Sequence, residues 1–156
     1  MEINVVAAVI AGLVGTAIIT GMMLGGKQLK LPSVDAHGIL GYIRQADQAG
    51  SLGYIMHFVL GAVFAIGYAI VFMIIPGNML ILGAGLGIIH WLVVGWMFAF
   101  APFVHAGMKA GLIQETGPYM LKSLGITGFI AGLVGHMVFG MMGGLVYGLI
   151  VGNFGG

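Results

Sequence analysis

The chain has 156 residues, of which 60% are hydrophobic and 6% are charged, and its formal net charge is +1. A soluble domain has about 25% charged residues, so this composition and the mean hydropathy of +1.15 indicate an integral membrane protein. The small net charge argues against nucleic-acid binding. The absence of cysteine excludes disulfides, thiolate metal sites and cysteine nucleophiles.

Four segments without Asp, Glu, Lys or Arg are long enough to cross a bilayer. A helix needs about 20 residues to span the hydrocarbon core, and these segments have 24, 24, 26 and 28 residues. The first lacks the basic start and the cleavage site of a signal peptide, so we expect it to be retained. The sequence therefore predicts a single transmembrane domain over residues 1–156, with spans at about 3–26, 52–75, 79–104 and 124–151.

The first span carries small residues at every fourth position, among them Gly12 and Thr16. Residues four apart share one face of a helix, and small residues on that face let another helix come close. We therefore expect this face to pack against a neighbouring span. In the connection that follows, Ile39, Leu40 and Ile43 predict one apolar face of a short interfacial helix.

The second and fourth spans carry the same kind of small-residue stripe, and each stripe is interrupted once by a histidine. His57 interrupts the stripe of the second span, and His136 interrupts the longer stripe of the fourth. A histidine in such a stripe is predicted to point into a helix–helix contact rather than toward lipid. The glycines predicted to pack in these two stripes are Gly53, Gly61, Gly128, Gly132, Gly140, Gly144 and Gly148.

The second and fourth spans also match each other as an internal repeat. A shift of 79 residues aligns His57 with His136 and Tyr68 with Tyr147, and a weaker match at a shift of 74 pairs Thr16 with His90. Parallel repeats of this kind occur in membrane proteins. We therefore predict an all-α membrane protein, a four-helix transmembrane bundle made of two tandem helical hairpins.

All five basic residues fall in the first and third connections, residues 27–51 and 105–123. The positive-inside rule places these loops in the cytoplasm and both termini outside. We therefore expect a multi-pass protein of the inner (cytoplasmic) membrane of the cell. His37 and His105 lie in these loops; a surface metal site is one interpretation, but solvated side chains are the simpler one.

Several short motifs resemble a known family. They are the segment Ala11-Gly12-Leu13-Val14-Gly15-Thr16, the pair His57-Phe58 followed by Gly61, the segment Gly135-His136-x2-Phe139-Gly140, and the pair Tyr147-Gly148. Together these motifs resemble an uncharacterised family of small bacterial and archaeal four-helix membrane proteins, a domain of unknown function. The resemblance covers most of the chain and implies the topology without implying an activity.

Three histidines lie within spans, His57, His90 and His136, and ionisable residues at this depth are candidates for function. Two helices could clamp haem b or another tetrapyrrole by bis-histidine ligation through His57 and His136. Several imidazoles could instead bind zinc, copper or iron, with the metal unknown. The third interpretation is packing, in which each imidazole is hydrogen-bonded to a carbonyl, threonine or tyrosine across a helix contact.

Enzyme signatures are missing from the chain, because no serine and no carboxylate lies inside a span and no nucleotide-binding motif is present. The leading prediction is a non-catalytic accessory or scaffold subunit of a larger respiratory or photosynthetic membrane assembly. Its partners would be the lipid bilayer and other membrane subunits, or further copies of itself. The alternatives are an electron-transfer protein that binds haem b or a metal through its histidines, and a small pore or transporter.

Overall fold

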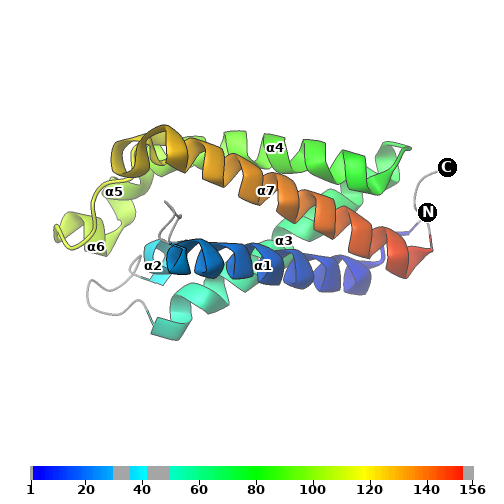
Figure 1. The fold of residues 1–156 in the computed structure, drawn as a ribbon. Coiled ribbons are helices and arrows are strands. Elements are labelled where there is room, and N and C mark those ends of the chain that lie inside the picture. The colour runs from blue at the N-terminus through cyan, green and yellow to red at the C-terminus, as the bar shows by residue number, and fades with distance from the viewer. Residues whose placement is uncertain (1, 30–35, 42–49, 153–156) are drawn as a thin grey trace. The chain divides into compact units, whose positions relative to one another are not determined.

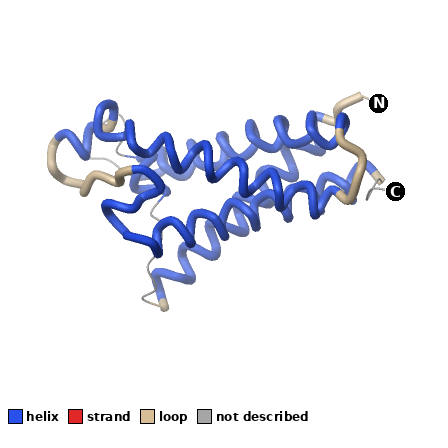
Figure 2. Tube along the Cα trace, turned by 90° about the horizontal axis from the view of Figure 1, so that it is seen from above, coloured by secondary structure: helices blue, strands red, loops and turns tan. Residues whose placement is uncertain are grey.

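The computed structural model describes residues 2–29, 36–41 and 50–152, and no strand occurs within these ranges (Figures 1 and 2). Four stretches are long and apolar enough to cross a membrane, which confirms the predicted all-α fold with four spans: Val5–Gln28, Ser51–Ile74, Met79–Val104 and Pro118–Val151. The long helices are α1 (Val5–Gln28), α3 (Gly50–Ile74), α4 (Met79–Met97) and α7 (Leu121–Val151). The short helices are α2 (Ala36–Gly41), α5 (Ala101–Val104) and α6 (Ala106–Lys109), with 3-10 turns at Phe98–Phe100 (η1) and Pro118–Met120 (η2).

Two asparagines mark where long helices begin. Asn4 Oδ1 accepts a hydrogen bond from the backbone N–H of Ala7 at 2.9 Å, before the first turn of α1. Asn78 Oδ1 accepts from the N–H groups of Leu80 and Ile81 at 3.0 and 3.2 Å, at the start of α4. Asparagine is a favoured N-cap because its oxygen satisfies N–H groups that have no partner within the helix. These caps fix the start of α1 and the sharp turn between α3 and α4.

The chain forms two compact units, and each long helix contributes one segment to each. Unit 1 comprises Met1–Met22, Phe58–His90 and Gly135–Gly156, and unit 2 comprises Met23–His57 and Trp91–Val134. We describe the two units separately.

In unit 1, the two helices of the first hairpin touch through their backbones. A Cβ atom on Gly12 of α1 would lie 2.5 Å from the carbonyl oxygen of Gly61 on α3. A Cβ on Gly61 would in turn collide with Oγ1 of Thr16, which donates a hydrogen bond to the Gly12 carbonyl at 2.8 Å. Only glycine permits this approach, so Gly12 and Gly61 set the distance between α1 and α3.

The second hairpin uses the same device with a regular antiparallel register. Added Cβ atoms on Gly83 and Gly140 would each strike the other residue's carbonyl oxygen, and one on Gly87 would strike the carbonyl oxygen of His136. The two residue numbers of each pair add up to 223, as they do for Met79 and Gly144, whose backbones also touch. Glycines four residues apart therefore keep α4 and α7 in backbone contact over successive turns.

Aromatic rings join the two hairpins within unit 1. The ring centroids of Tyr68 and Phe139 lie 5.7 Å apart, and those of Phe72 and Tyr147 lie 5.9 Å apart. Both distances fall in the range at which aromatic pairs attract one another. A Cβ on Gly15 of α1 would approach the ring of Phe139 to 3.0 Å, so α1 also packs against α7. Small residues thus hold each hairpin together, and rings fill the space between the hairpins.

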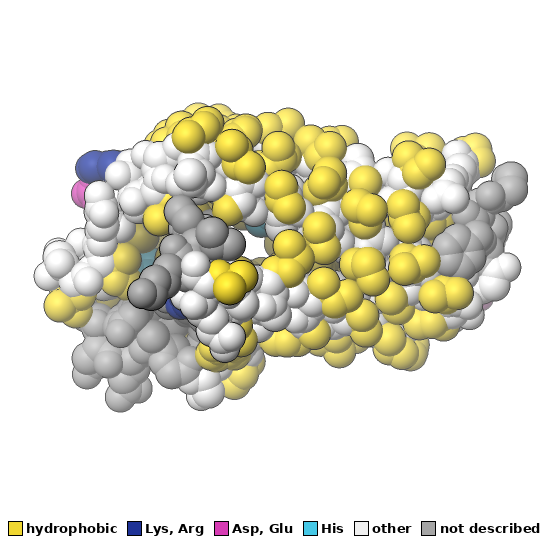
Figure 3. Space-filling view, in the orientation of Figure 1, with side chains coloured by type: hydrophobic (Ala, Val, Ile, Leu, Met, Phe, Trp, Pro, Cys, Tyr) yellow, Lys and Arg dark blue, Asp and Glu magenta, His cyan; other side chains and the backbone are white. Residues whose placement is uncertain are grey.

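The interior of unit 1 differs from the core of a soluble protein. Its buried hydrophobic residues are alanines, aromatic residues and one methionine, and no leucine, isoleucine or valine among the described residues is fully buried. Large aliphatic side chains instead cover the exterior, as Figure 3 shows for one face in yellow. Lipid is as apolar as leucine, so this distribution is typical of a protein whose solvent is the bilayer.

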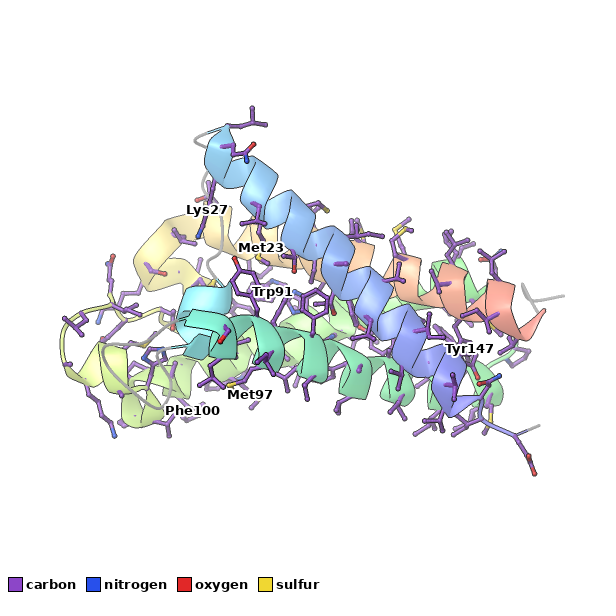
Figure 4. The ribbon with its side chains drawn as sticks, turned by 90° about the horizontal axis from the view of Figure 1, so that it is seen from below. Met23, Lys27, Trp91, Met97, Phe100 and Tyr147 are labelled. Carbon is purple, nitrogen blue, oxygen red and sulfur yellow. The ribbon has the colours of Figure 1, made fainter. Side chains whose placement is uncertain are left out.

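Unit 2 is built around Trp91, which is 1% exposed (Figure 4). A Cβ on Gly132 of α7 would strike the indole ring, and this pair continues the register of the second hairpin. The ring of Tyr119 lies 6.0 Å from that of Trp91, and Tyr119 Oη donates a hydrogen bond to the carbonyl of Leu92 at 3.0 Å. Tyr119 has a left-handed backbone with φ of 52°, and these contacts offset the strain of that conformation.

His105 corrects one of the sequence expectations, because it is 1% exposed rather than solvated. Its Nδ1 accepts a hydrogen bond from the N–H of Met108 and caps α6. Its Nε2 lies 2.7 Å from the carbonyl oxygen of Ile39, so Nε2 carries the proton and donates to α2. The imidazole joins the first and third connections. The side chain of His37 and the predicted contribution of Ile43 lie outside the described residues.

Replacing Gly83 by alanine is expected to lower the free energy of unfolding by about 1–3 kcal/mol, because the new methyl group would strike the Gly140 carbonyl. Gly85→Ala is the matched control on the same helix, since a Cβ there meets nothing within 4 Å. Alanine at that position should be neutral or stabilising, by up to about 1 kcal/mol. Reversible unfolding in detergent measures both changes, and equal effects of the two substitutions would contradict the packing described.

Candidate functional site

The structure brings together two of the three histidines predicted as ligands. His90 of α4 and His136 of α7 both belong to unit 1, and their ring centroids lie 4.8 Å apart with the ring planes at 89°. Both side chains are half-buried. His57 belongs to unit 2 on α3 and is also half-buried, so it is described apart from this pair.

A buried tyrosine completes the cluster. Tyr68 Oη and His90 Nδ1 are hydrogen-bonded at 3.1 Å, and either neutral tautomer of the imidazole can form this bond. Phe64, which lies on α3 like Tyr68, has its ring centroid 3.9 Å from that of His90. His90 is therefore oriented by a hydroxyl group at one ring nitrogen and by aromatic rings, and His136 lies edge to face against it.

The glycine register explains why these two imidazoles meet. Gly87 lies opposite His136, and only a glycine lets the α4 backbone approach the His136 carbonyl so closely. His90 follows Gly87 by three residues, so it lies one turn further along on the same side of α4. The packing of the second hairpin thus positions the histidine pair directly.

The unit that contains this cluster has almost no charged side chains. The sequence of unit 1 contains a single charged side chain, Glu2, near the start of the chain and outside the spans. The site can therefore offer imidazole nitrogens and a phenol, as ligands or hydrogen-bonding groups, without fixed charge.

A tetrapyrrole does not fit between His90 and His136 in this arrangement. Imidazole nitrogens bind a metal at about 2 Å, so two rings on opposite faces of a tetrapyrrole have centroids about 6 Å apart. The observed 4.8 Å leaves no space for the macrocycle. The bis-histidine interpretation made from sequence, which pairs His57 with His136, concerns residues of different units and stays a prediction.

A small metal ion is closer in size to this pair. Two imidazoles that bind one tetrahedral ion at about 2 Å have centroids about 5 Å apart. However, no three His, Cys, Asp or Glu side chains gather as a metal-binding group among the residues whose placement is described. An ion bound here would have two protein nitrogens and would take its other ligands from elsewhere, with Tyr68 orienting His90 through Nδ1.

The predicted packing residues all lie in the interior. Gly12, Gly61, Gly140 and Gly144 make the backbone contacts of unit 1 described above, and Thr16 contacts Gly12 and Gly61 through its side chain. Gly128 and Gly132 pack against Met120 and Trp91 in unit 2. All nine predicted positions are buried: Gly12, Thr16, Gly53, Gly61, Gly128, Gly132, Gly140, Gly144 and Gly148.

Two features of the site were missed by reasoning from the sequence. Tyr68 was recognised only as a repeat position, although a tyrosine on the span next to His90 is a natural hydrogen-bond partner. The stripe Gly83, Gly87, Trp91 and Gly95 on the third span has the same four-residue spacing as the other stripes, and all four residues are buried. That spacing was the signal that could have identified the packing face of α4.

Comparisons with known proteins return no relative. No protein-family model matches the chain, and neither a curated protein nor a solved structure matches it.

Replacing Tyr68 by phenylalanine is expected to remove the hydrogen bond to His90 and to lower the free energy of unfolding by about 0.6–1.7 kcal/mol. The ¹⁵N resonance of His90 Nδ1 should shift at the same time, as NMR of the detergent-solubilised protein would show. Tyr147→Phe is the control, because Tyr147 is also buried and we find no hydrogen bond of its hydroxyl within the described residues. An unchanged Nδ1 resonance in Tyr68→Phe would show that the bond does not form.

Proposed function

We propose that this polytopic membrane protein is a non-catalytic accessory or scaffold subunit of a larger assembly in the inner membrane, respiratory or photosynthetic. The observation that carries the proposal is a second small-residue stripe on α1, formed by Ala17, Gly21 and Gly25. Ala17 and Gly21 are exposed and Gly25 is half-buried. A Cβ added to either glycine meets nothing within 4 Å.

This outer stripe differs from most of the described exterior, where large aliphatic side chains are exposed. The inner face of α1 already uses Gly12 and Thr16 for contact with α3. Small residues four apart allow close helix packing in membranes, and lipid chains gain nothing from them. The outer stripe therefore favours contact with a helix of another subunit or of a second copy.

The charge distribution supports an orientation for this subunit. The five basic residues all lie in residues 27–51 and 105–123, which favours placing these connections in the cytoplasm and both termini outside. The resemblance to small four-helix membrane proteins is compatible with this role, and membership of that family is part of the proposal.

Gly21→Leu is expected to weaken association about five- to 150-fold, because a bulky side chain in a close helix contact costs about 1–3 kcal/mol. Gly67→Leu on α3 is the matched control, since Gly67 is also exposed and a Cβ there meets nothing within 4 Å. Native mass measured after mild solubilisation from the source membrane reports the assembly, and circular dichroism reports the fold. A wild-type protein that is strictly monomeric, or equal assembly in both variants, would contradict the proposal.

The histidine pair supports a second candidate function, electron transfer or metal handling by a bound metal ion; the haem b version of this function depends instead on the pairing of His57 with His136 made from sequence. The supporting observation is the contact of His90 with His136, with Tyr68 bonded to the first imidazole.

A visible spectrum and elemental analysis of the gently purified protein separate the two versions of this alternative. A Soret band lost in both His57→Ala and His136→Ala, and kept in His90→Ala, would support the tetrapyrrole version. Bound copper, zinc or iron that is lost in His90→Ala and His136→Ala, and kept in His57→Ala, would support a metal at the pair. A colourless, metal-free protein would exclude both versions and leave packing as the role of the histidines.

A further inference from the structure

A pocket of about 360 Å³ opens at the end of unit 1 where α1 and α4 begin and α3 and α7 finish. Pockets for small ligands measure about 300–1,000 Å³, so this one is large enough for an organic group. It is lined on one side by Glu2 and Asn4 and elsewhere by aromatic, thioether and aliphatic side chains. Figure 4 shows Tyr147, one of its lining residues, on the last turns of α7. The histidine cluster does not contribute to this pocket.

The pocket has a negative charge with no basic residue to balance it in the same unit. Glu2 is the single charged side chain in the sequence of unit 1, and all five Lys and Arg residues belong to the ranges of unit 2. Two helices begin at the pocket and two end there, so their dipoles largely cancel. Among the side chains that line the pocket, the carboxylate of Glu2 is the one that carries a charge, and its sign favours a cation.

Aromatic rings form the inner wall. Phe72 and Tyr147 are 7% and 5% exposed, and their ring centroids lie 5.9 Å apart. A cation within about 6 Å of a ring centroid is attracted by the ring, and both rings belong to the lining of the pocket. Met73 and Met79 also line it, and thioethers are polarisable and adapt to irregular shapes.

The size and the lining select the type of cation. A water molecule occupies about 30 Å³ in the liquid, so the pocket would hold a bare inorganic ion together with most of its hydration shell. Such an ion would gain little from the rings and thioethers. A substituted ammonium is large and weakly hydrated, and its methyl or methylene groups can contact apolar side chains while its charge faces a carboxylate.

We infer that this pocket binds an organic ammonium group, carried by a free solute or by a lipid headgroup, with Glu2 facing the charge and Phe72 and Tyr147 contacting the alkyl groups. This inference is independent of the assembly proposed above, because it concerns the opposite end of α1 from Gly21 and Gly25.

Calorimetric titration of the full chain in a neutral maltoside detergent tests the inference, with choline as the probe. We expect choline to bind. We expect its neutral isostere 3,3-dimethylbutan-1-ol to bind at least about tenfold more weakly. Glu2→Gln should weaken choline binding about tenfold, and Phe72→Leu should weaken it several-fold. Glu115→Gln is the control, because Glu115 is an exposed carboxylate of unit 2 that pairs with Lys122. Gly21→Leu should leave choline binding unchanged.

A lipid arm distinguishes the source of the ammonium group. Native mass spectrometry of the protein in mixed phosphatidylethanolamine and phosphatidylglycerol compares the lipids retained by the wild type and by Glu2→Gln. Retention of phosphatidylethanolamine that depends on Glu2 supports a headgroup, and choline binding without a lipid preference supports a free solute. The inference is overturned if choline and the isostere bind equally, if Glu2→Gln binds choline like the wild type, or if neither arm detects binding.

Discussion

Backbone contact between helices is the constraint on which the rest of unit 1 depends. In a bilayer, burial of apolar side chains gives little net drive for helices to associate, so close packing and polar contacts must supply it. Gly83, Gly87 and Gly140 bring α4 and α7 together until main-chain atoms touch, and Gly12 and Gly61 do the same for α1 and α3. The space between the hairpins is filled by aromatic rings, those of Tyr68, Phe72, Phe139 and Tyr147.

The register of the second hairpin also determines where large side chains are allowed. Along the α4–α7 contact, a bulky residue on one helix always faces a glycine on the other, as Trp91 faces Gly132 and His136 faces Gly87. A histidine in a glycine stripe is therefore not an interruption of the packing but one half of a complementary pair. The imidazole of His136 lies against the ring of His90, and His90 is hydrogen-bonded to Tyr68.

Reasoning from the sequence predicted the four spans and the buried small-residue positions, because length, hydropathy and four-residue spacing depend on a single helix. It did not predict which stripe faces which, since a stripe defines a face and not its partner. For that reason the contact of His90 with His136 in unit 1 was not predicted as a pair, and the pairing of His57 with His136 stays a prediction. The burial of His105 was missed for a related reason: its partner Ile39 lies 66 residues away, in another connection.

The two hairpins are alike in their backbone contacts and different in their polar chemistry. The weaker repeat aligns Thr16 with His90, and each lies beside the glycine contact of its own hairpin. Thr16 satisfies its hydroxyl within α1 by donating to the Gly12 carbonyl, so it needs nothing from another helix. His90 is bonded instead to Tyr68 of the other hairpin and touches His136. The equivalent positions of the two hairpins therefore make different polar contacts, because Thr16 is bonded within its own helix and His90 is bonded to the other hairpin.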